Sequence, residues 1–149
     1  MAASHRARIA LSGGYAESNA ASNPDGMHHW AFEPFFDPDA FELVMNIIHG
    51  HTKHVPIELE LGTLAKVAAV VDDLRCEDAV WFFAKLWIRN LDNLPLGDTF
   101  DNLSRWIMIS SVFNEPDIFA RCTRKVIVYT TGSLPTRNEF HIWPSILGE

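Results

Sequence analysis

Three histidines stand within six residues in the stretch HGHTKH, at His49, His51 and His54. His28 and His29 lie upstream. Imidazole is the commonest metal ligand and a general base near neutral pH. The stretch therefore raises two chemical interpretations, a metal site and a catalytic site. The third interpretation is a loop without chemistry of its own.

The ligands available around these histidines argue against a zinc site. Zn²⁺ takes about four N or S ligands in a tetrahedral array, usually with an acceptor behind each His. HGHTKH supplies three imidazoles with Lys53 among them, and no Cys or carboxylate falls at ligand spacing. Asp72, Asp73 and Glu77 are the carboxylates that folding could bring nearby. We expect a histidine-rich loop and no cofactor. The alternative is a small metal-binding protein or metal-dependent hydrolase that uses the three histidines.

The other reactive side chains favour structural roles. Cys76 and Cys122 fall on predicted helices, which is typical of reduced core thiols in an intracellular, cytoplasmic or nuclear protein. The carboxylates of DDLRCED suit helix capping and solvation. Ser110 lacks the G-x-S-x-G context of an activated nucleophile. We therefore expect no enzyme activity.

Composition bounds the class of protein. A chain of 149 residues suits one domain with a real core. Its 48% hydrophobic and 21% charged residues are close to the globular average. The formal net charge of -7 argues against nucleic acid and anionic membranes as partners. The longest apolar runs are also too short to span a bilayer.

Helical periodicity begins at Asp37, which can cap a helix whose first position is Pro38. Gly50 is expected to end that helix. Apolar spacing then predicts a second helix from Leu61 to Leu74 and a third from Cys76 to about Leu91. Acidic residues between the two favour a helix start there, so we expect an antiparallel hairpin.

Two more helices are expected after the break NLDNLPLGD. Asp98 or Thr99 opens the fourth helix, and Asn114 caps the fifth, because Pro116 and Asp117 follow it. The predicted inner residues are Phe100, Leu103, Ile107 and Ser110 on the fourth helix and Phe119, Cys122 and Val126 on the fifth.

The predicted fold class is mostly α with a little β (α+β). Residues 27–35 alternate loosely and would form a short strand, and 57–61 suit an extended link. We expect a mobile N-terminal segment over 1–26, a core over 27–95, and a helical extension with an irregular tail over 96–149.

Several stretches in order point to a family. They are FDPDAFELVMNIIHG, VP and LGTLAKVAAVVDDLRCEDAVWFFAKLW, with weaker echoes in ALSGGYAES, FNEPDIFARCTRKVIVYTTGSLP and WPSIL. From Phe36 on, the chain resembles the BTB/POZ domain as it occurs in fungal proteins. The resemblance implies a small sheet packed on a cluster of helices, followed by a helical extension. It also places His49 and Gly50 at the end of a helix, where a partly protonated imidazole is favoured.

The resemblance implies a non-enzymatic protein–protein interaction module that self-associates or acts as an adaptor, for example toward a cullin-type ubiquitin ligase. No motif for a cullin-facing surface can be matched in this chain. The family's opening β-hairpin and first helix, which help build its homodimer interface, have no counterpart here. The core face that they normally cover would therefore be open.

Aromatic side chains mark the expected partner surface. Helical geometry directs Trp81 and Phe82 away from Phe83, so the three cannot share one core. The favoured interpretation is that part of this aromatic set packs against the fourth and fifth helices, and the second is that it forms an exposed partner surface. Other aromatic residues flank the missing opening elements. The predicted partner surface comprises Phe35, Phe36, Phe41, Trp81 and Phe82.

Overall fold

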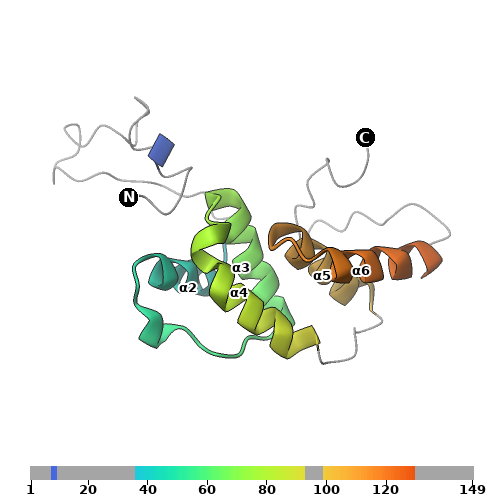
Figure 1. Ribbon diagram of the computed structural model, residues 1–149, viewed down its shortest axis with the longest axis horizontal. Coiled ribbons are helices and arrows are strands. Elements are labelled where there is room, and N and C mark those ends of the chain that lie inside the picture. The colour runs from blue at the N-terminus through green and yellow to red at the C-terminus, as the bar shows by residue number, and fades with distance from the viewer. Residues whose placement is uncertain (1–7, 10–35, 93–98, 130–149) are drawn as a thin grey trace.

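Five α-helices form the described part of the chain, and Figure 1 shows their arrangement. This computed structural model describes residues 8–9, 36–92 and 99–129. The elements are α2 (Pro38–Ile48), the short 3-10 helix η3 (Thr52–His54), α3 (Leu61–Leu74), α4 (Glu77–Asp92), α5 (Phe100–Val112) and α6 (Pro116–Tyr129).

The described ranges are helical and contain no strand, so the expected β component is not seen there. The stretch from Ile57 to Glu60 leads into α3 without pairing as a strand. The strand expected over 27–35 lies outside the described residues. So do the C-terminal tail and most of the expected N-terminal segment.

Both ends of α2 lie where the sequence predicts them. The Asp37 carboxylate accepts a hydrogen bond from the Ala40 amide at 3.1 Å, and Pro38 occupies the first turn. His49 follows the last helical residue, and Gly50 adopts a φ of 74°. Asp37 also pairs with Lys66 at 2.7 Å, which ties the start of α2 to α3.

Three helices end in the same way, with one residue in the left-handed region. These residues are Gly50, Arg75 and Asn114, with φ values of 74°, 51° and 53°. In each case the next amide donates to a carbonyl five residues back, as in a Schellman motif. The bonds are His51 N to Asn46 O (2.8 Å), Cys76 N to Val71 O (3.3 Å) and Glu115 N to Ser110 O (2.8 Å).

The predicted cap of the fifth helix was wrong. Asn114 lies in the left-handed region and ends α5. The carbonyl of Glu115 accepts the first bond of α6, from the Phe119 amide at 3.0 Å. Asn tolerates the left-handed conformation as well as it caps a helix, and the short link between α5 and α6 requires the former.

Helix α3 is the centre of the packing, because it contacts α2, α4 and α5. Figure 1 shows α2 and α4 on one side of the molecule and the α5–α6 pair on the other. With neighbours on several sides, α3 buries most of its circumference rather than one stripe. Its buried residues are Leu64, Ala65, Val67, Ala68, Val70, Val71 and Leu74.

The inner faces of α5 and α6 differ from the prediction. Trp106 and Ile109 are buried on α5, whereas Ile107 is only partly buried. On α6, Ile118 takes the place expected of Phe119. Helix α5 packs against both α3 and α6, so these two neighbours determine which of its residues are buried. The spacing of apolar residues within α5 does not show where the neighbours lie. The predictions for Leu103, Ser110, Cys122 and Val126 are confirmed.

Candidate interaction surface

The three histidines lie on the surface at the end of α2 and in η3. His49, His51 and His54 are all exposed. The Nδ1 atom of His49 is 2.8 Å from the carbonyl oxygen of Met45, within the last turn of α2. This contact places the imidazole against the C-terminal turn of α2. The ring centroids of His49 and His51 are 6.3 Å apart.

These histidines do not gather further ligands within the described residues. There, no group of three or more His, Cys, Asp or Glu side chains is placed to hold a metal ion. His28 and His29 lie outside those ranges. Asp72, one of the carboxylates considered as an additional ligand, lies 3.5 Å from the guanidinium of Arg75. Among the described side chains, the HGHTKH stretch has the geometry of a surface loop.

Both thiols are buried. Cys76 is 2% exposed, and Cys122 is 0% exposed. Burial, together with the nearby charge of Glu77, raises the pKa of the Cys76 thiol to about 12. The thiol is therefore protonated at neutral pH, and a protonated thiol is a poor nucleophile and metal ligand.

Two members of the predicted partner surface pack against the core instead of forming an open face. The rings of Phe36 and Phe41 stack with centroids 6.2 Å apart. Both are half-buried against the hydrophobic core. Phe35 lies outside the described residues. The described part of this region is thus partly covered by its own packing.

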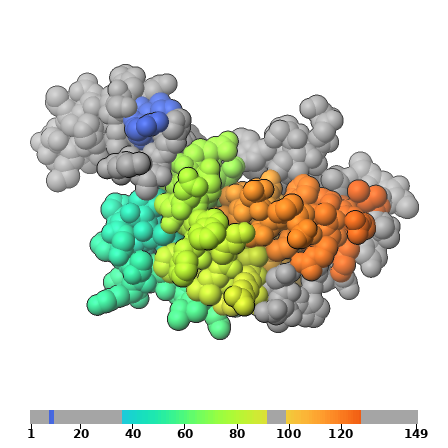
Figure 2. Space-filling view, viewed as in Figure 1, coloured from blue at the N-terminus to red at the C-terminus, as the bar shows by residue number. Residues whose placement is uncertain are grey.

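Trp81 and Phe82 are the two aromatic side chains that α4 leaves in solvent. They are 56% and 66% exposed, as helical geometry predicts. The opposite side of α4 carries Val80, Ala84 and Trp87, all within the core. Figure 2 shows atoms of α4 in yellow-green at the centre of the viewed face, between α2 and the α5–α6 pair.

A chain of ring contacts connects the exposed Phe82 to the core. Phe82 meets Phe83 edge to face, with centroids 5.6 Å apart. Phe83 in turn lies 5.8 Å from the buried Trp87. A ring held by such contacts loses less conformational freedom when a partner covers it. The ring of Phe82 is thus exposed to solvent and held by its neighbours.

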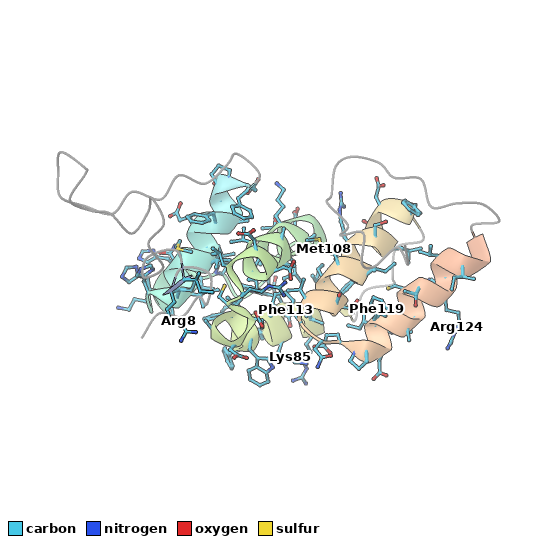
Figure 3. The ribbon with its side chains drawn as sticks, turned by 90° about the horizontal axis from the view of Figure 1, so that it is seen from above. Arg8, Lys85, Met108, Phe113, Phe119 and Arg124 are labelled. Atoms are coloured by element: carbon cyan, nitrogen blue, oxygen red, sulfur yellow. The ribbon has the colours of Figure 1, made fainter. Side chains whose placement is uncertain are left out.

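Three charged residues share this side of α4, and the sequence-based prediction of the surface missed them. Asp78, Trp81, Phe82, Lys85 and Arg89 follow helical spacing of i, i+3, i+4, i+7 and i+11. The Lys85 ammonium bonds the Glu115 carboxylate at the turn between α5 and α6. Figure 3 shows Lys85 and Phe113 about midway along the long axis of the molecule. The spacing is visible in the sequence once the buried side of α4 is known.

No protein-family model matches the chain, and neither does a curated protein or a solved structure. None of the helices in the described ranges is long and apolar enough to cross a membrane.

Proposed function

We propose that the chain is a non-enzymatic protein–protein interaction module of the BTB/POZ type, which works by self-association or as an adaptor inside the cell. The observation that carries the proposal is the exposed aromatic pair, Trp81 and Phe82, on the outer face of α4. Trp and other aromatic residues are enriched in protein interfaces and dominate their energetics.

The fold does not need aromatic residues at these two positions. Val80, Ala84, Trp87 and Ile88 are the buried core residues of α4. Contiguous exposed apolar area on a small protein is a feature of interaction sites. Covering Trp81 and Phe82 with a partner would remove this area from water, and burial of apolar surface drives association.

The resemblance described above supports the same class. The stretches that carry it form α2, α3 and α4, so the aromatic pair lies on the part of the chain that resembles the BTB/POZ domain. A cytoplasmic or nuclear location and a cullin-type ligase as one candidate partner belong to this proposal. The histidine loop favours no second function, because its described side chains do not converge on a common point.

Proximity labelling in the cells that express the protein tests the proposal. The variant Trp81→Ser/Phe82→Ser should lose most of the neighbours that the wild-type chain labels. The matched control is Ile127→Ser, because Ile127 is a 74% exposed apolar side chain on α6. The control should retain the wild-type set. If the double variant folds and labels the same neighbours as wild type, the aromatic pair is not the interaction surface.

A further inference from the structure

The charged residues on the outer side of α4 are distributed unequally along the helix, with acidic and basic residues at opposite ends. We call Asp78, Trp81, Phe82, Lys85 and Arg89 the α4 stripe. At 1.5 Å per residue the stripe spans roughly 16 Å. Its acidic member stands at the N-terminal end, its aromatic pair in the middle and its two cations at the C-terminal end.

This order is complementary to itself in one orientation only. Two parallel copies of the stripe would oppose like charges at each end. Two antiparallel copies bring the acidic end of one against the basic end of the other, while the aromatic centres meet. Like charges at close contact are unfavourable and opposite charges fix orientation.

We propose that the partner that covers the α4 stripe is a second copy of this chain, bound antiparallel about a two-fold axis between Trp81 and Phe82. The inference rests on the proposed function and identifies the partner. About that axis Trp81 meets Phe82 of the second copy, and Asp78 meets Lys85, because each pair is equidistant from the centre. Such a contact is isologous and closes as a dimer.

Lys85 can serve both contacts. Its side chain is 41% exposed and already bonds Glu115. An ammonium group has three donors, so a second carboxylate can approach it from the solvent side. Arg89 lies one turn further along the stripe and adds positive charge beyond Lys85.

The small apolar area that the aromatic rings could bury predicts a weak dimer. Aromatic side chains bury roughly 150–250 Å² each, so the exposed parts of four rings supply about 500 Å² in all. Interfaces below about 1,200 Å² belong to weak and transient complexes. This dimer differs from the one that the family resemblance implies, which would use the opening hairpin and first helix.

Sedimentation velocity of the full chain over a dilution series measures the association. The wild-type mass should rise reversibly with concentration from 16.8 kDa toward twice that value. Trp81→Ser/Phe82→Ser should weaken dimerisation at least tenfold, as loss of interface aromatics does. Ile127→Ser should leave it unchanged. Thermal melts by circular dichroism verify that each variant folds.

Charge reversal tests the antiparallel orientation. Asp78→Lys and Lys85→Glu should each weaken the homodimer a few-fold, the scale of exposed charge pairs, because each variant opposes like charges at positions 78 and 85. An equimolar mixture of the two should associate more tightly than either alone, because two acidic side chains at positions 78 and 85 of one variant then face two basic side chains at these positions of the other. Recovery of association in the mixture would distinguish the antiparallel contact between two α4 stripes from non-specific apolar association.

Each other outcome overturns the dimer. A chain that stays monomeric up to about 0.5 mM has no affinity in the range of even weak complexes. Equal loss in Ile127→Ser, or no rescue in the mixture, would also refute the arrangement. If the chain is monomeric while proximity labelling still depends on Trp81 and Phe82, the proposed function stands and the partner is a different protein.

Discussion

The indole Nε1–H of Trp87 donates a hydrogen bond to the carbonyl oxygen of Pro56 at 2.9 Å. The bond joins residues 31 positions apart and fastens the segment before α3 to α4. The neighbouring Val55 is buried, and the Asn90 side-chain amide lies 3.4 Å from the carbonyl oxygen of Ile57. One buried side chain thus fills the core and holds a segment that has no regular structure of its own.

Replacement of Trp87 separates these two roles. Trp87→Phe keeps an aromatic core residue but leaves the Pro56 carbonyl without its donor, so we expect a loss of about 1–3 kcal/mol in the free energy of unfolding. Trp87→Ala should cost about 3–5 kcal/mol. Urea unfolding measures both. The exposed loop variant Glu58→Ala should change stability by less than about 0.5 kcal/mol. Equal stability of Trp87→Phe and wild type would show that the hydrogen bond contributes nothing.

The burial difference on α5 predicts unequal costs for two isoleucines. Ile109 is 0% exposed, whereas Ile107 is partly buried. Ile109→Ala should lower the free energy of unfolding by about 2–5 kcal/mol through lost burial and a residual cavity. Ile107→Ala should cost clearly less. Chemical denaturation measures both costs. If Ile107→Ala lowers the free energy of unfolding more than Ile109→Ala does, the buried side of α5 is the one that helical spacing alone predicts.

At the left-handed helix ends, adding a side chain to glycine should lower the stability of the fold, and replacing a larger residue by glycine should raise it. Gly50→Ala should destabilise by about 1 kcal/mol, because a Cβ is unfavourable in this backbone region. A Cβ at Gly50 meets no atom within 4 Å, so the loss would be conformational rather than steric. Arg75→Gly should stabilise by a similar amount, since the exposed pair of Arg75 with Asp72 contributes little. Thermal unfolding reports the shifts, and a loss of stability in Arg75→Gly would contradict the explanation.

Asp37 predicts a pH-dependent contribution. The hydrogen bond from Lys66 and that from the Ala40 amide hold the pKa of the Asp37 carboxyl below its usual value. A carboxyl whose pKa is lowered on folding stabilises the protein above its unfolded pKa, and this contribution is lost as the pH falls through the folded pKa. Asp37→Asn keeps the cap but removes the charge. It should cost up to about 1 kcal/mol at pH 7 and nothing at strongly acidic pH.

Paired unfolding curves at several pH values measure this difference. Glu42→Gln removes an exposed carboxylate on the same helix and serves as the control. A cost of Asp37→Asn that stays constant from neutral to acidic pH would mean that the pair with Lys66 does not stabilise the fold.

The helix positions could be predicted because their signals are local. Asp37 reaches an amide three residues ahead, and Thr99 likewise accepts from Asn102 at 3.4 Å. Such contacts depend on neighbours in the chain, which the sequence displays directly. Helical spacing set Trp81 and Phe82 apart from Phe83 but left open whether they pack against α5 and α6, and the structure shows both exposed.

Asn114 and Ile109 mark the limit of that reasoning. Asn114 is compatible with either side of a helix boundary, and the link between α5 and α6 selected one of them. Ile109 became the fully buried isoleucine of α5 because α3 and α6 lie against that helix. Neither neighbour is implied by the spacing of residues within α5.

By itself, the sequence determined the helical content of the described chain and the start of each helix within about two residues, because backbone capping and side-chain periodicity act over one or two turns. Only the tertiary structure decided which side of α5 is buried, that Trp87 binds Pro56, and that Lys85 meets Glu115 beside the aromatic pair. These contacts join residues about thirty positions apart, and their partners are chosen by how the helices pack.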